Sequence, residues 1–485
     1  MKTRIKNLFL LPALMAGFGL LPAGRVTAQT FTNLYSFTAT GGAYSNSDGA
    51  YPSAGLILSG NTLYGTTQLG GTNGEGTVFA VHTDGTGFTT LHSFKALINS
   101  TNSDGANPQA GLLLSGQFLF GTTENGGTNG NGTVFFLRSD GLYFTNLHNF
   151  TALSTPFGGT NSDGANPAAG LILSDLLTLC GTAQHGGTNG NGTVFALNVD
   201  GTGFTVLHTF TANKSGTNSD GATPLGGLIA SANDTLYGTA NGGGTYGNGT
   251  VFALNPDGTG FTNLYSFTAF SSVYFNNYDG ENPYGGLVLS DGTLYGTTHS
   301  GGTNNAGTVF AVATNGTGFT VLHGFTGGSD GANPYAGLVL SGSTLFGTAG
   351  NGGNAYDGTV FAVNTNGTGF TTPHTFTNSP DGYSPHAGLI SSGNTLYGTT
   401  DIGGTNGTGM VFSLSLPTPR LTITFSGSSV VMVWPTNLLN FTLQSTTNLD
   451  PVWSPVPLSP VIINGQNVVT NPISGAPQQF FRLSL

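Results

Sequence analysis

Five histidines recur at one position of a repeated sequence, and a histidine cluster is a pattern that could bind a metal ion. They are His92, His148, His208, His323 and His374. Tyr35 and Tyr265 take this position in two further copies. Metal ligands must converge to within about 2.0–2.3 Å of one ion, whereas equivalent residues of separate repeats lie far apart. We therefore expect a structural role, in which a ring nitrogen bonds the neighbouring loop.

Most carboxylates also belong to turns. An Asp-Gly step recurs in loops related to SDGANP, at Asp48, Asp104, Asp163, Asp220, Asp279, Asp330 and Asp381. A glycosidase needs two carboxyl groups about 5–10 Å apart across a cleft, and no non-repeating pair stands out among the remaining Asp residues and Glu75, Glu124 and Glu281. Asx-type turns explain the loop aspartates better than Ca²⁺, which wants six to eight oxygen ligands. We expect no cofactor, with Ca²⁺ as the alternative.

The single cysteine gives little reason to expect catalysis. Cys180 occupies a position that holds tyrosine or phenylalanine in the other copies. We interpret it as a buried filler rather than a nucleophile. A lone cysteine also excludes an intramolecular disulfide framework.

Four strand-like runs in each copy must position these residues. In the sixth copy they span 336–341, 344–349, 358–364 and 370–376, named strands A to D here. They are rich in β-branched and aromatic residues and are bounded by Gly, Asn, Asp or Ser. The short A–B and C–D links predict antiparallel hairpins. Seven such copies of about 51–59 residues predict a β-propeller with one four-stranded blade per copy.

The two ends of the repeat region complement each other. Residues 31–37 resemble a strand D with no A, B or C before it, and the seventh copy ends after strand C at 409–416. Pairing these segments would close the ring and remove an exposed sheet edge. The predicted fold is all-β: a seven-bladed β-propeller over 29–416, closed by the N-terminal strand, followed by a small β-sandwich-like domain over 417–485.

One face of the predicted propeller carries the longer D–A and B–C links, and sequence variation concentrates there. The residue directly after the D–A proline is Ser53, Gln109, Ala168, Leu225, Tyr284, Tyr335 or His386. We expect this set to surround one mouth of the central channel, with Gln109, Tyr284, Tyr335 and His386 as ligand contacts. Further aromatic candidates in the links are Tyr246, Tyr356, Phe157, Tyr274, Phe275 and Tyr278. Such rings suit stacking on sugar faces; the alternative is packing within their own loops.

Charge and the N-terminal segment restrict partners and location. Residues 1–28 have the pattern of a signal peptide, with Lys2, Arg4 and Lys6 before an apolar run and small residues before Gln29. An uncleaved anchor is the alternative, but the run is short and contains Pro12, and no later segment could span a bilayer. Removal of residues 1–28 leaves five basic against 20 acidic residues. This balance excludes nucleic acid and anionic membranes as partners.

The motifs GTVFAL, SDGANP, SGNTLYGTT and GGTNGNG resemble those of the GloVer tandem-repeat family of exported bacterial proteins, over about residues 31–415. The resemblance implies a secreted or cell-surface location and implies no established activity or catalytic residues. The C-terminal pattern, with Trp434, LQSTTNL, Trp453 and FFRL, resembles modules of secreted bacterial proteins. We expect this module to dock on the propeller or to serve attachment or export, with a plain spacer as the alternative.

These observations favour a monomeric, exported, non-catalytic binding or surface scaffold whose ligand is a glycan or cell-surface partner on the D–A/B–C loop face. A glycan-active hydrolase or lyase at the channel mouth is one alternative, and a structural surface-layer or adhesion protein is another. A non-repeating acid–base group with a shifted pKa would favour the enzyme. The candidates for it are His185, His299, His386, Asp357 and Asp401.

Overall fold

Short antiparallel strands provide nearly all the regular structure of the chain. A computed structural model describes residues 29–155, 158–269, 277–377, 379–417, 421–435, 442–447, 453–463, 466–472 and 479–484. Among these residues the one helical element is the 3-10 helix η1 (Gly42–Tyr44), and none is a helix long and apolar enough for a membrane span. The all-β prediction is confirmed. The predicted signal peptide, residues 1–28, lies outside the described residues.

Within the described part of 29–416, the strands form seven four-stranded antiparallel sheets. Sheet 1 contains β2 (Ile57–Ser59), β3 (Thr62–Thr67), β4 (Thr77–His82) and β5 (Thr89–Ser93); sheet 2 contains β6 (Leu113–Ser115), β7 (Phe118–Thr123), β8 (Thr133–Arg138) and β9 (Phe144–Asn149). Sheet 3 contains β10 (Ile172–Leu173), β11 (Thr178–Ala183), β12 (Thr193–Asn198) and β13 (Thr205–Thr209); sheet 4 contains β14 (Ile229–Ala230), β15 (Leu236–Ala240), β16 (Thr250–Leu254) and β17 (Thr262–Ser266). Sheet 5 contains β18 (Val288–Ser290), β19 (Thr293–Thr298), β20 (Thr308–Ala313) and β21 (Thr320–Gly324); sheet 6 contains β22 (Val339–Ser341), β23 (Thr344–Ala349), β24 (Thr359–Asn364) and β25 (Thr371–Thr375). Sheet 7 contains β26 (Ile390–Ser392), β27 (Thr395–Thr400), β28 (Met410–Ser415) and β1 (Thr30–Ser36).

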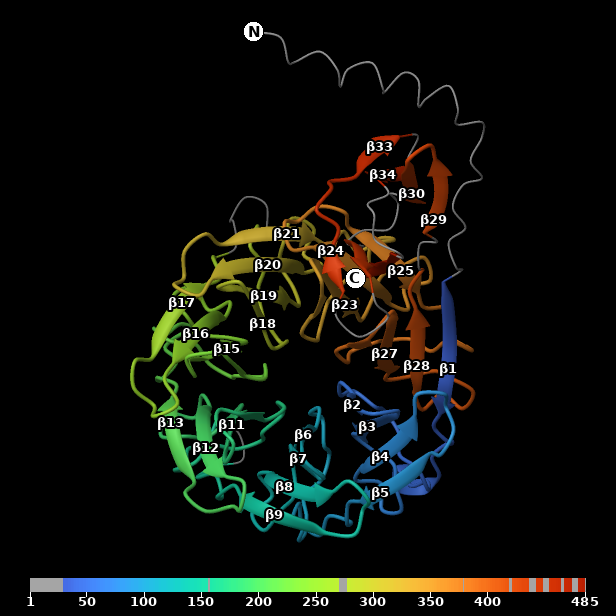
Figure 1. Cartoon of the computed structure of the whole chain (residues 1–485). Helices are drawn as coiled ribbons and strands as arrows, with labels where there is room; N and C mark the ends of the chain where they lie inside the picture. Colours follow the sequence, from blue (N-terminus) through green and yellow to red (C-terminus); the bar gives the residue numbers. More distant parts are fainter. Residues whose placement is uncertain are drawn as a thin grey trace. The chain divides into compact units, whose positions relative to one another are not determined.

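The sheets follow one another around a common centre, with the first strand of each sheet toward that centre (Figure 1). Sheet 7 has the order β26-β27-β28-β1, so its outer strand comes from the other end of the repeat region. The amide of Phe37 extends this pairing with a 3.1 Å hydrogen bond to the carbonyl of Gly409. Residues Phe31–Leu414 form one compact unit of the chain.

Each sheet is built around one buried phenylalanine of its third strand. These fully buried rings are Phe79, Phe135, Phe195, Phe252, Phe310, Phe361 and Phe412. Each ring lies over a glycine of the second strand; a Cβ on Gly347, for example, would lie 2.5 Å from Phe361 Cζ. The glycine of the repeated LYGTT motif is therefore required by packing, because any side chain would overlap the ring.

The innermost backbones touch from one sheet to the next. A Cβ on Gly111 would lie 3.1 Å from the carbonyl oxygen of Gly55, and one on Gly55 would lie 3.4 Å from that of Gly388. A threonine hydroxyl from each second strand also donates to a carbonyl of the following sheet, as Thr66 does to Ala110 at 3.1 Å. The corresponding donors are Thr122, Thr182, Thr239, Thr297, Thr348 and Thr399.

Residues from Ser415 onward belong to a second compact unit. Its described strands form a sheet of β29 (Thr422–Ser426), β30 (Ser429–Pro435), β34 (Gln466–Pro472) and β33 (Val461–Ile463), and a sheet of β32 (Ser454–Pro455), β31 (Thr442–Thr446) and β35 (Phe480–Ser484). Met432, Trp434 and Val469 of the first sheet share a buried cluster with Leu443 and Phe481 of the second. Apolar contact between two sheets thus provides the core of this unit.

Candidate functional site

The residues that follow the D–A prolines all reach one pocket of about 540 Å³. They are Ser53, Gln109, Ala168, Leu225, Tyr284, Tyr335 and His386. Each precedes the innermost strand of its sheet, so the repeat itself brings one side chain per sheet to the same opening. Seven equivalent positions that vary between copies therefore lie together at one pocket.

A second set of lining residues follows the second strand of a sheet. Gln68, Glu124, Gln184 and Asp401 each stand directly after the repeated Gly-Thr-Thr or Gly-Thr-Ala and line the pocket. The sequence interpretation did not connect Glu124 with Asp401, because they are far apart in the chain. The sequence did contain a signal for this second set, because the residue directly after Gly-Thr-Thr or Gly-Thr-Ala differs from copy to copy.

Amide side chains surround a carboxyl group on the part of the pocket formed by sheets 2 and 3. Gln184 Nε2 donates to Glu124 Oε1 at 3.0 Å, and Gln109 Nε2 donates to Glu124 Oε2. Burial raises the pKa of Glu124, and the two amide hydrogen bonds only partly offset that effect. This side offers hydrogen-bonding groups that are already held in place.

Aromatic rings form the part of the pocket contributed by sheets 5 to 7. Tyr284 and Tyr335 are stacked with centroids 4.5 Å apart, and the ring of His386 lies 4.9 Å from that of Tyr335. His299, directly after β19, meets both tyrosine rings edge-on at 5.1 Å. Burial lowers the pKa of His299, and the neighbouring His386 lowers it further. His299 contacts the two tyrosines but does not itself line the pocket, and the phenol rings give the pocket an apolar surface with polar edges.

His386 and Asp401 form a hydrogen-bonded pair beside these rings. His386 Nδ1 lies 2.8 Å from Asp401 Oδ2, and both residues line the pocket. Burial raises the pKa of Tyr335 to about 12, with further contributions from Tyr284 and the charge of Asp401. The Tyr335 hydroxyl therefore stays protonated over the physiological range, and it is hydrogen-bonded to Tyr284.

The structure places the other candidates outside the pocket lining. Tyr246 and Tyr356 are 50% and 76% exposed, and neither they nor His185 and Asp357 line the pocket. Tyr278 is also exposed, at 63%. Phe157, Tyr274 and Phe275 lie outside the described residues.

A family model described as the Gloeobacter/Verrucomicrobia repeat matches residues 19–160, 102–274 and 269–441. These matches together cover most of the chain. The chain belongs to the Gloeobacter/Verrucomicrobia repeat family. The family resemblance inferred from the sequence is thereby confirmed.

Comparison of this Gloeobacter/Verrucomicrobia repeat protein with curated proteins finds no match. Among solved structures, it is similar to an oligogalacturonate lyase in complex with manganese, at 12% identity, with 82% of this chain and 99% of that chain covered and a TM-score of 0.48. A putative 6-phosphogluconolactonase from Bacteroides uniformis is similar at 14% identity, with 87% and 98% covered and a TM-score of 0.41. A chain of a nidogen/laminin complex is similar at 15% identity, with 60% and 86% covered and a TM-score of 0.36. Similarities at this level carry no argument about function.

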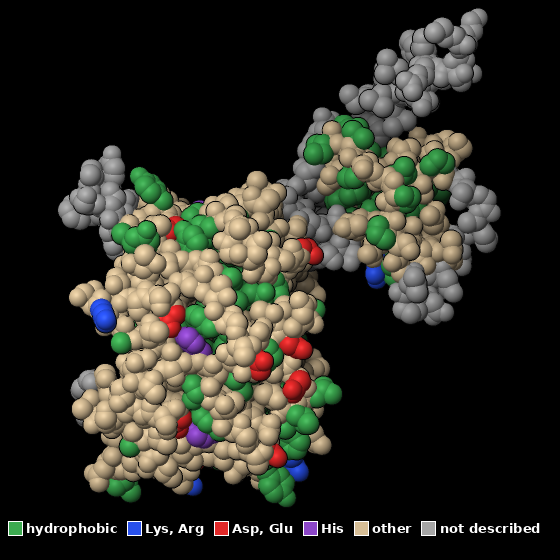
Figure 2. All heavy atoms as spheres, turned by 90° about the vertical axis from the view of Figure 1, so that its left-hand side faces the viewer, with side chains coloured by type: hydrophobic (Ala, Val, Ile, Leu, Met, Phe, Trp, Pro, Cys, Tyr) green, Lys and Arg blue, Asp and Glu red, His purple; other side chains and the backbone are tan. Residues whose placement is uncertain are grey.

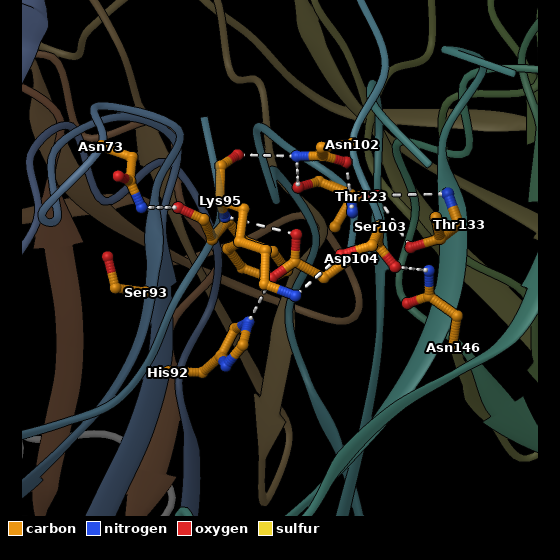
Figure 3. Close-up of polar contacts among 12 residues, drawn as sticks. Asn73, His92, Ser93, Lys95, Asn102, Ser103, Asp104, Thr123, Thr133 and Asn146 are labelled. Atoms are coloured by element: carbon orange, nitrogen blue, oxygen red, sulfur yellow. Dashed lines mark hydrogen bonds and ion pairs between the residues drawn. The ribbon is translucent and has the colours of Figure 1, made fainter. Parts of the chain in front are cut away.

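The repeated histidines of this Gloeobacter/Verrucomicrobia repeat protein bond the loop aspartates, as predicted. His92 Nε2 lies 3.1 Å from Asp104 Oδ2 (Figure 3). The other four His–Asp distances are 2.9–3.1 Å, and Tyr35 and Tyr265 donate to Asp48 and Asp279 at 2.7 Å. In six copies a threonine hydroxyl donates to the same aspartate. These aspartate oxygens accept hydrogen bonds from protein donors, as the turn interpretation predicts.

Each of these histidine or tyrosine rings also stacks on a phenylalanine of the next sheet, with centroids 3.6–4.1 Å apart. Asn102 orders the same loop in Figure 3, because its Oδ1 accepts from the amides of Gly105 and Gly127. Among the described residues, no group of three or more His, Cys, Asp or Glu is placed to hold a metal ion. Cys180 is fully buried, as the filler interpretation predicts, and burial raises the pKa of its thiol.

Proposed function

We propose that residues 29–416 form a closed seven-bladed β-propeller that binds a glycan in the pocket lined by Gln109, Tyr284, Tyr335 and His386. The observation that carries the proposal is the shared pocket of the residues following the D–A prolines. In this unit the repeats keep their packing residues and vary the residues that face one opening. Variable residues gathered at one pocket of a regular scaffold are typical of a binding site.

The chemistry of the pocket suits a sugar. Sugars present apolar C–H faces and polar hydroxyl edges, and the pocket offers both kinds of partner. Tyr335, whose ring lies between those of Tyr284 and His386, is 37% exposed, and Glu124, Gln109 and Gln184 provide hydrogen-bonding groups. Binding pockets commonly combine aromatic walls with a few fixed polar groups in this way.

Closure of the propeller is supported by contacts between the first and last copies. Thr399 donates to the carbonyls of Pro52 and Ala54, and Phe31 of β1 stacks on His374 with centroids 4.1 Å apart. A closed ring keeps all blade edges paired and fixes the pocket residues relative to one another.

We further propose that the protein is exported and acts outside the cell or at its surface, as a monomeric propeller. The pattern of residues 1–28 supports export. Charged residues make up only 6% of the chain, and most side chains on the flank drawn in Figure 2 are neither acidic nor basic, which suits a partner bound through stacking and hydrogen bonds. The C-terminal unit would then serve docking, attachment or export.

A glycan hydrolase or lyase is the second candidate, because one pocket contains Glu124, with a raised pKa, and Asp401, which is paired with His386. Two carboxyl groups in unlike environments are the pattern of acid–base catalysis on sugars. Turnover of an oligosaccharide that is lost in both Glu124→Gln and Asp401→Asn would establish this candidate in place of a binding protein.

A glycan array followed by calorimetric titration of the hits tests the binding proposal. Tyr335→Ala should weaken binding by about threefold to tenfold, because a stacked aromatic contributes about 0.5–1.5 kcal/mol beyond its buried area. Tyr246→Ala is the matched control, since Tyr246 is an exposed tyrosine of the same unit outside the pocket. Equal effects of the two changes, or no binding to any glycan, would reject the proposal.

A further inference from the structure

One acceptor in the pocket lacks a protein donor. Asp401 Oδ2 is hydrogen-bonded to His386 Nδ1 at 2.8 Å. Asp401 Oδ1 is buried and has no hydrogen-bond partner among the described residues. A buried carboxylate oxygen without a donor destabilises the site, because it has lost water without replacement. A donor supplied by a ligand would remove that penalty.

The charge of the pocket favours a positive ligand over a negative one. Glu124 and Asp401 line it, and no lysine or arginine does so among the described residues. Within residues 29–416 the sequence has only Lys95, Arg138 and Lys214 as permanent cations. A cavity with carboxyl groups and no compensating cation attracts a cation and disfavours a uronic acid.

Aromatic rings stand next to the same carboxylate. The Tyr335 ring lies 4.9 Å from the ring of His386, which is itself bonded to Asp401, and 4.5 Å from the ring of Tyr284. Ring faces attract ammonium groups through the cation–π interaction, and a carboxylate oxygen adds a charge-assisted hydrogen bond. A neutral hydroxyl group benefits much less from either interaction.

We infer that the pocket selects a glycan carrying a protonated amino group, with the ammonium held by the carboxylate of Asp401 beside the aromatic group that includes Tyr335. The sugar hydroxyls would then meet Gln109, Glu124 and Gln184 on the other side of the pocket. This inference rests on the proposed glycan binding and names the class of glycan.

The test compares three oligosaccharides of equal length by calorimetric titration of the purified protein, below the pKa of the amine. They are an oligomer of β-1,4-linked glucosamine, its N-acetylated counterpart and an oligomer of galacturonic acid. The amino oligomer should bind about tenfold more tightly than the acetylated one, because it alone makes the charge-assisted contact. The galacturonic acid oligomer should bind most weakly.

Variants separate the Asp401 contact from the general attraction of a negative protein for a cation. Asp401→Asn should bring the ratio of the amino and acetylated affinities close to one. Asp401→Gln is a second variant, since Gln68 and Gln184 already occupy this register in other sheets. Asp257→Asn is the matched control, because it removes the same charge from an exposed turn where other copies have Asn315 and Asn366; it should leave the ratio unchanged.

The outcomes are distinct. If the amino oligomer binds no more tightly than the acetylated one, or if Asp401→Asn and Asp401→Gln keep the preference, the inference is overturned while glycan binding stands. If none of the three oligosaccharides binds and the array gives no hits, the inference and the proposed function both fail.

Discussion

Thr399 donates a hydrogen bond to the carbonyl oxygen of Pro52 at 2.6 Å, although 347 residues separate them in the chain. Its equivalent in sheet 1, Thr66, donates to Ala110 of the neighbouring sheet at 3.1 Å. The same threonine position therefore links consecutive copies and also links the last copy to the first. Closure of the proposed ring accounts for a contact of such long sequence separation.

Thr399→Val tests this link, because valine keeps the shape of threonine and removes the hydroxyl. The change leaves buried carbonyl groups without that donor, so the free energy of unfolding should fall by about 1–3 kcal/mol. Thr66→Val is the matched control between consecutive sheets and should cost a similar amount. Urea unfolding measures both; a cost for Thr66→Val with none for Thr399→Val would show that the first and last copies are not joined in solution.

The inner glycines give a second test of packing around the centre. A Cβ on Gly337 would lie 2.7 Å from the carbonyl oxygen of Gly286, whereas one on Gly227 would lie 3.6 Å from that of Gly170. Gly337→Ala should therefore destabilise the protein by about 1–3 kcal/mol through overpacking. Gly227→Ala should be neutral or stabilise it by up to about 1 kcal/mol, by restricting the unfolded chain. Thermal unfolding that ranks the two variants in the opposite order would contradict this geometry.

Strand positions could be predicted where a run of β-branched and aromatic residues is bounded by turn residues such as Gly, Asn, Asp or Ser. The expected strand at 344–349 is β23 (Thr344–Ala349), and the one expected at 370–376 is β25 (Thr371–Thr375). The innermost strand is shorter than expected, Val339–Ser341 instead of 336–341. Gly337, within the missing part, packs on the backbone of Gly286 in the next sheet, and this tertiary contact leaves no local signal.

The pocket could be predicted only in part. Tyr284, Tyr335, His386 and Gln109 share the obvious position after a proline, and the structure places all four in the pocket. Glu124 was not expected there, because its register position follows a strand whose side chains otherwise serve packing. The pairing of Gln184 with Glu124 joins two sheets and depends on their spacing, which the sequence of one repeat does not contain.

Two of the repeated histidines, on the outer strands of sheets 5 and 6, should make the fold sensitive to acid. Burial lowers the pKa of His323 and His374 below the ordinary 6.5, and Asp330 and Asp381 only partly offset it. The unfolded chain then binds these protons at higher pH than the folded protein. Stability is therefore complete above about pH 6.5 and falls as the pH decreases through the folded-state pKa values.

The double variant His323→Tyr and His374→Tyr should reduce this loss between about pH 8 and about pH 5. Tyrosine is a matched replacement, because Tyr35 and Tyr265 already make the same bond to the loop aspartate. Urea unfolding at several pH values gives the slope of the free energy of unfolding against pH. A variant with an unchanged slope would show that other groups cause the acid sensitivity.

Glu124 should affect stability with the opposite dependence on pH. Burial raises its folded-state pKa, and hydrogen bonds from Gln184 and Gln109 offset this only in part. The folded protein thus holds this proton more tightly than the unfolded chain, so the contribution of Glu124 is most favourable below its ordinary pKa of 4.5 and is lost as the pH rises. Glu124→Gln, which cannot ionise, should gain stability relative to the unchanged protein on going from about pH 4 to about pH 7.

Asp257→Asn serves as the control for this titration. Hydrogen bonds from Thr259 lower the pKa of Asp257 in an exposed turn, so its replacement should lose relative stability over the same rise in pH. Denaturant unfolding of both variants and of the unchanged protein at the two pH values measures whether each variant gains or loses stability relative to the unchanged protein as the pH rises. If Glu124→Gln is destabilised equally at the two pH values, the prediction is wrong. The contacts with Gln109 and Gln184 then depend on the shape of the Glu124 side chain and not on its charge.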